Sequence, residues 1–300
     1  ANNTLTENYG RPSKGAAYAL RGMVYMWKKQ YDLAINDFEQ VSKCGYGLWE
    51  GKYIDFFKYE NEKDKEMIFP LQYDEDSGYC DNIQLMVGAR DHYDCWTELL
   101  PSADFVDYYR NADGSEFKWS DYLTGWNNLT PAQREVFFLR DNLISNKTAY
   151  NNAKSRIGTA VMDKYYLNSG NEARIKKAYS SRDPRLQQTI ITPYSSTNCY
   201  SPYWNNGEPM QNKVLRWPYL NRGGNNGDMW HNQRNAGYYI YKKYNETEKG
   251  RYIERLRCHC DFPLIRFTDV WLLYAEALNE RDRLDEAITA VNKIRQRAGM

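Results

Sequence analysis

Two stretches near opposite ends of the chain share one helical spacing, which constrains the fold more than any other feature. Between residues 14 and 45, apolar and small residues recur at steps of four and three: Tyr18, Gly22, Tyr25, Ala34, Phe38 and Val41. The closing stretch repeats these steps with Trp271, Ala275, Leu278, Ala287, Val291 and Ile294. Such steps place side chains on one face of an α-helix. Each stretch therefore predicts a hairpin of two amphipathic helices.

Small residues occupy the positions where the two helices of each hairpin would cross. Gly22 and Ala275 let the partner helix approach, and Ala34 and Ala287 do the same from the other side. This pattern is typical of a tetratricopeptide helix pair, a unit that needs stacked neighbours to cover its apolar face. Only two pairs are legible, so we expect the helical array to extend beyond residue 1 or residue 300. The alternative is a chance match, since small and apolar residues are common.

The separation between the two hairpins predicts a large insertion, because one repeat spans only about 34 residues. We expect a mainly α fold that forms a single domain over 1–300. Its predicted parts are a hairpin at 13–45, a loop-rich ligand-binding insertion with a few short strands at 46–265, and a second hairpin at 266–300. Insertions in helical arrays emerge on one face, which often carries the binding function.

Short elements are predicted inside the insertion. Period-two patterns and β-branched residues favour strands at 66–74, within 182–193 after a turn, and at 237–245. Capping residues favour helices at 102–110, after Ser102, and at 130–140, with Thr130 as the cap and Pro131 at the first position. The stretches 74–96 and 194–236 are predicted to be long loops, and loops of that length are usually functional or disordered.

The aromatic content distinguishes these loops from disordered segments, which are poor in aromatic residues. The chain has 27 Tyr and 9 Trp at a mean hydropathy of −0.84, so many rings must lie near polar surface. Its 40 Lys and Arg nearly balance 39 Asp and Glu, which gives no field that would favour nucleic acid or an anionic membrane. No apolar run approaches the roughly 18 residues of a membrane span.

Five motifs, in order along the chain, resemble landmarks of the SusD/RagB family. They are "RPSKGAAYALRGMVYMWKKQYDLAINDFEQV", "LPSADFVDYYRNADGSEFKW", "SRDPRLQQTIITP", "GYYIYKKYN" and "FPLIRFTDVWLLYAEALNE" with its continuation "AITAVNKIRQRAG". The closing motif is the most specific, and its polar positions are Arg266, Glu276, Asn292, Arg295 and Arg297. These residues look architectural in the family. We expect Glu276 to pair with Arg266 or Arg295, because it lies on a face that also carries apolar residues.

The resemblance implies a SusD-like α/α superhelix with a noncatalytic function. Members of the family are outer-membrane, cell-surface lipoproteins of Bacteroidetes-type bacteria that capture oligosaccharide for a SusC-like TonB-dependent transporter. The glycan and the transporter are therefore the expected partners, and neither nucleic acid nor a cofactor is expected. The family's lipidated N-terminus and its C-terminal tail have no counterpart here, so we expect an internal portion whose lipid anchor lies outside this chain.

Two groups of loop residues are candidates for holding a sugar. Aromatic faces stack on the C–H patch of a pyranose, and Asn, Asp and Arg offer forked partners for its hydroxyls. The first group lies where the resemblance places glycan-facing residues: Tyr79, Arg90, Asp91, Tyr93 and Trp96. The second group lies in the longer loop: Tyr203, Trp204, Trp217, Tyr219 and Trp230. Each ring could instead pack its own loop. We expect Trp119 to belong to the scaffold.

Other functions remain open at this stage. A glycoside hydrolase needs two carboxylates about 5 to 10 Å apart, and the sequence pairs no two distant acids. Neither a nucleophile elbow, nor H-E-x-x-H, nor a phosphate-binding loop is present, and "RCHCD" at 257–261 is too closely spaced for a usual zinc site. We therefore expect no metal and no catalysis. A protein-interaction scaffold and a peptide-binding protein of the same architecture are the remaining alternatives.

Overall fold

The computed structural model describes residues 9–74, 76–232, 238–249 and 254–300, and the chain forms two compact units. Unit 1 contains the residues up to Asp81 and those from Cys258 onward, and unit 2 is Asn82–Arg257. The division into parts at 13–45, 46–265 and 266–300 stays a prediction. Within the described residues, no helix is both long and apolar enough to cross a membrane.

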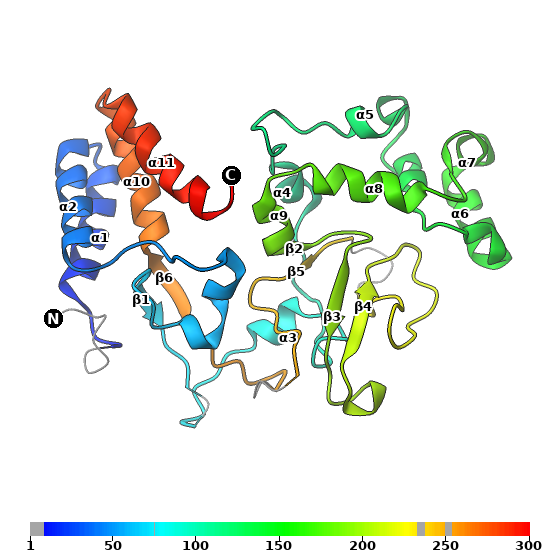
Figure 1. Cartoon of the computed structure of the whole chain (residues 1–300), viewed down its shortest axis with the longest axis horizontal. Helices are drawn as coiled ribbons and strands as arrows, with labels where there is room; N and C mark the ends of the chain where they lie inside the picture. Colours follow the sequence, from blue (N-terminus) through cyan, green and yellow to red (C-terminus); the bar gives the residue numbers. More distant parts are fainter. Residues whose placement is uncertain (1–8, 75, 233–237, 250–253) are drawn as a thin grey trace. The chain divides into compact units, whose positions relative to one another are not determined.

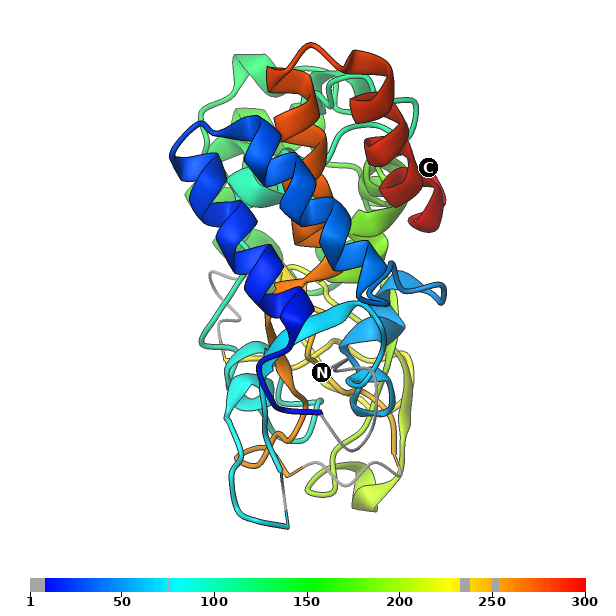
Figure 2. The same ribbon diagram turned by 90° about the vertical axis from the view of Figure 1, so that its left-hand side faces the viewer.

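Unit 1 contains both predicted helical hairpins. The first is α1 (Lys14–Trp27) with α2 (Tyr31–Lys43), and the second is α10 (Phe267–Glu280) with α11 (Leu284–Arg297). Figures 1 and 2 show the four helices side by side, with α2 packed against both α1 and α10. The prediction of a mainly α fold built on tetratricopeptide-like hairpins is confirmed.

The small residues allow the close helix crossing that the spacing predicts. A Cβ at Gly22 would lie 2.4 Å from an edge carbon of Phe38, so only glycine fits without movement. Phe38 and Ala34 are fully buried in the same core, and Ala275 and Ala287 are buried where the second hairpin joins it. The crossing of α1 over α2 therefore depends on the missing side chain at position 22.

A buried carboxylate connects the helices of unit 1 to its small sheet. Glu66 is fully buried and accepts hydrogen bonds from the Trp49 N–H at 2.6 Å, the Thr268 hydroxyl at 2.5 Å and the Arg297 guanidinium at 2.5 Å. Arg266 pairs with Asp269 at 3.0 Å and lies 3.7 Å from Glu66. Among the described residues, Glu276 forms an ion pair with neither Arg266 nor Arg295, so the expected pairing is wrong. Glu276 is exposed, so water solvates its charge and it needs no cation.

The strands form three short antiparallel pairs. The pairs are β1 (Met67–Leu71) with β6 (Phe262–Arg266), β2 (Ile190–Ile191) with β5 (Ile240–Tyr241), and β3 (Ser196–Cys199) with β4 (Met210–Val214). The first pair lies in unit 1 and the other two lie in unit 2. The predicted strands at 66–74 and 237–245 thus form in part, with Gly237 outside the described residues. Strands β3 and β4 lie within the stretch 194–236, which was predicted as a loop and of which 233–236 are not described.

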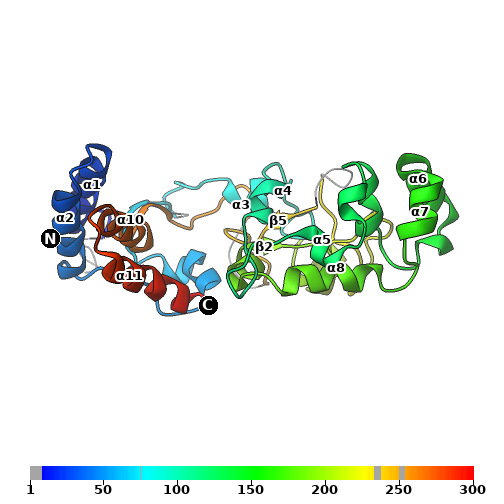
Figure 3. The same ribbon diagram turned by 90° about the horizontal axis from the view of Figure 1, so that it is seen from above.

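Unit 2 adds short helices around an aromatic core. They are α3 (Ile83–Val87), α4 (Ala103–Asp107), α5 (Trp119–Tyr122), α6 (Lys147–Ile157), α7 (Thr159–Tyr165), α8 (Asn171–Ser180) and α9 (Pro184–Thr189). Figures 1 and 3 show α6 and α7 next to each other. Trp119 is buried against Phe117, Trp126 and Tyr179 and donates its indole N–H to Asp107, as expected for a scaffold residue.

The structure differs from the sequence expectations in three segments of unit 2. Residues 184–189 form α9, capped by the Asp183 carboxylate, and only two strand residues follow. Residues 133–138 form a 3₁₀ helix rather than an α-helix, although Thr130 does accept the predicted hydrogen bond from the Gln133 N–H at 3.4 Å. The helices α6, α7 and α8 were not predicted, because their apolar residues are too few to mark a face.

The substitution Gly22→Ala tests the helix crossing in unit 1. Alanine raises helix propensity by about 1 kcal/mol, but its methyl group would overlap Phe38, so we expect the free energy of unfolding to fall by about 1 to 3 kcal/mol. Urea denaturation measures the change. Phe38→Leu in the Gly22→Ala background should recover part of the loss. Leu20→Ala, on the exposed face of α1, is the matched control. A Gly22→Ala protein as stable as the parent would contradict this crossing.

Candidate functional site

The ten predicted ligand residues are distributed over both units. Tyr79 belongs to unit 1 and is 73% exposed, and the other nine lie in unit 2. Trp96 and Tyr203 are exposed at 38% and 53%. Tyr93 is only 3% exposed, and its hydroxyl donates to the Glu248 carbonyl at 2.7 Å, so its ring offers no face to a ligand. We therefore revise its role to packing.

The structure brings two rings of the second predicted group together with an arginine in one place, which we call the two-indole cluster (Trp204, Trp230 and Arg222). The two indole rings meet at 62° with centroids 5.1 Å apart. The guanidinium carbon of Arg222 lies 4.2 Å from the Trp204 ring centroid and 4.5 Å from that of Trp230. Both indoles are partly exposed, so the cluster presents aromatic surface beside a cation.

Asp91 is buried below the two-indole cluster and accepts hydrogen bonds from two of its residues. It is fully buried and accepts hydrogen bonds from Arg222 Nε at 2.8 Å and from the Trp230 backbone N–H at 2.9 Å. The fully buried Lys213 lies 3.2 Å from the same carboxylate and also donates to the carbonyls of Arg222 and Gly223. Asp91 was expected to touch the ligand, but its complete burial makes it a positioning residue for Arg222.

The turn that carries Asp91 has a strained backbone. Tyr93, Asp94 and Thr97 all have positive φ angles, between 52° and 61°, which residues other than glycine rarely adopt. Strain of this kind persists only where the surroundings determine it, and it is common at binding sites. Within this turn, Arg90 Nη1 donates a hydrogen bond to the Asp94 carboxylate at 2.9 Å.

Arg222 itself was missed by the sequence analysis. Its position depends on Gly227, where a Cβ would lie 1.8 Å from the Arg222 carbonyl oxygen, so the chain closes into a compact loop only with glycine. A signal was present in the sequence, because Arg222 is the only Lys or Arg between Trp217 and Trp230. A lone cation between tryptophans in an aromatic loop is a candidate for stacking.

A second place in unit 2 combines Trp217 and Tyr219 in a pocket of about 640 Å³. The other residues that line it are Asn146, Thr148, Ala149, Asn152, Arg156, Pro218 and Leu220. This volume lies within the usual range for small-ligand sites. Arg156 Nη2 and the Trp217 indole N–H both donate to one Glu135 oxygen, at 2.5 and 2.9 Å, which fixes the ring beside the guanidinium.

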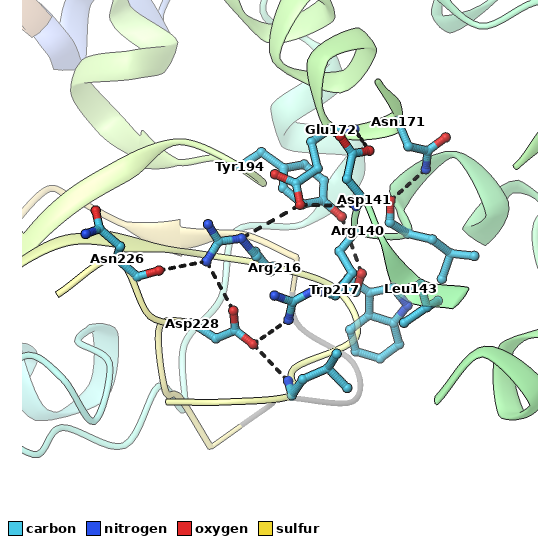
Figure 4. A network of polar contacts seen from close by, with 12 residues as sticks. Arg140, Asp141, Leu143, Asn171, Glu172, Tyr194, Arg216, Trp217, Asn226 and Asp228 are labelled. Carbon is cyan, nitrogen blue, oxygen red and sulfur yellow. Dashed lines mark hydrogen bonds and ion pairs between the residues drawn. The ribbon is translucent and has the colours of Figure 1, made fainter. Parts of the chain in front are cut away.

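A polar network fixes the segment that carries Trp217 (Figure 4). Arg140 donates its backbone N–H to the Trp217 carbonyl at 2.6 Å and its guanidinium to Asp228 at 2.6 Å. Asp228 also accepts from Arg216 at 3.2 Å and from the Leu220 N–H at 2.8 Å. One buried carboxylate therefore ties both ends of the loop 216–228 to the scaffold.

A buried histidine and cysteine lie beside the site, and their chemistry favours a structural role. His92 Nδ1 accepts the Ala89 backbone N–H at 3.2 Å, so the proton of the neutral ring is on Nε2, which faces Cys199 Sγ at 3.2 Å. Burial lowers the pKa of His92 to about 4 and raises the pKa of the Cys199 thiol. Both groups are therefore neutral near pH 7, unlike a thiolate–imidazolium pair.

The described residues contain no group of three or more His, Cys, Asp or Glu side chains that could hold a metal ion. In the "RCHCD" segment, Cys258, His259 and Cys260 are all buried, and the His259 ring packs edge-on against Tyr59 with centroids 4.4 Å apart. A hydrogen bond with Cys260 and burial raise the pKa of Cys258. This segment therefore packs unit 1 rather than presenting thiolates.

Tetratricopeptide-like hairpins together with a loop-rich unit define a class of helical scaffold proteins with a large insertion. A sequence model described as the SusD family matches residues 54–300, and the chain belongs to this family. No curated protein sequence matches the chain.

Solved structures share the fold. A SusD-like protein from Bacteroides fragilis NCTC 9343 is 23% identical with a TM-score of 0.61, covering 98% of this chain and 48% of its own. A SusD-like carbohydrate binding protein from the same strain is 20% identical with a TM-score of 0.59, covering 98% and 46%. A structure with xylogluco-oligosaccharide is 15% identical with a TM-score of 0.52, covering 97% and 45%. The chain thus spans about half the length of these proteins.

The buried His92 predicts acid sensitivity of unit 2. The folded protein keeps the ring neutral down to about pH 4, whereas the unfolded chain binds a proton below its ordinary pKa of about 6.5. The contribution of His92 to the free energy of unfolding should therefore decrease as pH falls from about 6.5 to 4, by about 3 kcal/mol at most. Denaturant titrations at several pH values measure this. His92→Asn should flatten the slope in this window, and His259→Gln, which keeps His92, should not. An unchanged slope in His92→Asn would contradict the assignment.

Proposed function

We propose that this chain captures glycans without cleaving them, using the ring-lined sites of unit 2. The observation that carries the proposal is the pocket in which Trp217 and Tyr219 lie beside Arg156 and the Asn152 amide. A sugar stacks its C–H face on an aromatic ring while neighbouring hydroxyls pair with a guanidinium or an amide. Family membership, a similar carbohydrate binding protein and a similar structure with xylogluco-oligosaccharide support the same class of ligand.

The composition of the pocket favours binding over hydrolysis. Glycoside cleavage needs two carboxylates on either side of the scissile bond. The described residues that line the pocket include no Asp or Glu, and the nearby Glu135 is engaged by Arg156 and Trp217. The pocket therefore offers stacking surface and hydrogen-bond donors rather than an acid and a base.

We further propose, from family membership, that the captured glycan passes to a TonB-dependent outer-membrane transporter. Outer-membrane, cell-surface localisation through a lipid anchor outside this chain belongs to the same proposal. The Bacteroides origin of similar structures supports it. Co-purification with a transporter from native membranes tests this step separately from glycan binding.

One observation favours the alternative of a protein- or peptide-binding scaffold. A groove of about 470 Å³ runs between α10 and α11, and its walls include the exposed Leu272 and Ile288. Binding through this groove would be insensitive to the rings of unit 2, so the variants below distinguish the two functions.

Calorimetry against fragments of starch, mannan, host glycan and other plant polysaccharides tests the proposal. We expect at least one fragment to bind, and Tyr219→Ala and Trp217→Ala each to weaken it at least about tenfold, or about 1.4 kcal/mol, because the stacking face is lost. Tyr108→Ala removes a ring that is 84% exposed outside the pocket and is the matched control. Chromatography of the incubated fragments checks for products. The absence of binding to every fragment, or any defined cleavage product, would overturn the proposal.

A further inference from the structure

Among the described residues at the two-indole cluster, basic side chains outnumber acidic ones, beginning with the buried residues beneath the indoles. The fully buried Lys213 and the partly exposed Arg222 share the single carboxylate of Asp91, at 3.2 and 2.7 Å. Neither the lysine nor the aspartate contacts solvent. Two cations therefore pair with one anion at the base of the cluster. The partly exposed guanidinium of Arg222 places the unbalanced positive charge between the two indoles.

A second imbalance of the same kind lies at the edge of the cluster. Arg90 and Arg255 share the carboxylate of Asp94, which is itself only 9% exposed. The Arg90 guanidinium lies 5.9 Å from the Trp230 ring centroid, so this second group adjoins the same indole that Arg222 contacts. Arg90 Nε also donates to the Asn232 side chain at 2.7 Å, which fixes the orientation of the guanidinium.

Burial increases the effect of this excess charge on a ligand. The charge of an exposed cation is screened over about 8 to 10 Å at physiological salt. Beneath a low-dielectric aromatic surface, the interaction of a cation with a nearby charge is several times stronger than in water. The side chains of Arg222, Arg90 and Arg255 are 24%, 24% and 29% exposed, so they are accessible at one edge while the rest of each side chain is packed. The described part of this cluster is thus suited to receive one anionic group.

We propose that the two-indole cluster is a subsite for an acidic sugar, with the indoles stacking on the sugar ring and Arg222 with Arg90 binding its carboxylate or sulfate. This inference rests on the proposed glycan-binding function and names the class of ligand. Arg222 Nε and Nη2 face Asp91, and Arg90 Nε and Nη1 bind Asn232 and Asp94, so Arg222 Nη1 and Arg90 Nη2 are the groups that would donate to the anion. A hydrogen bond between a guanidinium and an anion is stronger than one to a neutral hydroxyl. Asp91 and Asp94 orient the two arginines as positioning residues.

Calorimetry with matched oligosaccharides tests the charge requirement. The probes are trigalacturonate, its fully methyl-esterified form, which has the same backbone without charge, and a sulfated galactan trisaccharide. We expect trigalacturonate, the sulfated probe or both to bind at least about tenfold more tightly than the ester. Raising the salt concentration should reduce this preference because screening weakens the ion pair.

Variants assign the preference to the cluster. Arg90→Gln should remove most of the preference for the acid, and the fold should be preserved because Arg255 still neutralises Asp94. Arg222→Gln should act in the same direction, with its fold checked by circular dichroism. Lys176→Gln removes the same charge from an exposed position on α8 and is the matched control.

The outcomes separate this inference from the proposed function. Equal affinity for the acid, the sulfated probe and the ester would overturn the inference and leave neutral glycan binding intact. An anion preference that Lys176→Gln reduces as much as Arg90→Gln would also overturn it, because the effect would then be general charge. Absence of binding by every oligosaccharide would overturn both. A preference lost only with Arg90 or Arg222 would establish the subsite.

Discussion

The ion pair between Asp91 and Arg222 is the interaction on which the candidate binding surface depends. The two residues are far apart in the sequence, yet their contact fixes a guanidinium between two indoles from the same long loop. A buried carboxylate is costly unless it is paired and hydrogen-bonded. Here Lys213 and a backbone N–H complete its partners, so the strained turn and the aromatic loop are held as one body.

A buried carboxylate that accepts several hydrogen bonds occurs at two other places in the chain. Asp228 receives two arginines and two backbone N–H groups beneath Trp217, and Glu66 receives a hydroxyl, a backbone N–H and Arg297 in unit 1. Hydrogen bonds to a charged acceptor are stronger than neutral ones and set direction as well as energy. Irregular segments rich in aromatic residues can therefore present their rings in fixed positions with few strands.

The sequence predicted the hairpins well because their contacts are local and periodic: Gly22 and Phe38 lie on consecutive helices. It failed for α6 and α8, which carry few apolar residues, such as Ile157 and Ile175, and are stabilised by a shared core rather than by an amphipathic face. The sequence analysis also divided the candidate ligand-binding residues into two groups by their position in the chain. Only the folded structure shows that Trp230 lies with Arg90 and that Asp91 is buried beneath both.

Amide hydrogen exchange with and without the tightest-binding oligosaccharide tests most directly whether the aromatic loops of unit 2 are the binding surface. The account predicts slower exchange in residues 203–206 and 217–232 on adding the glycan, with the amides of α1, α2, α10 and α11 unchanged. Protection confined to the groove between α10 and α11, with these loops exchanging as before, would contradict it.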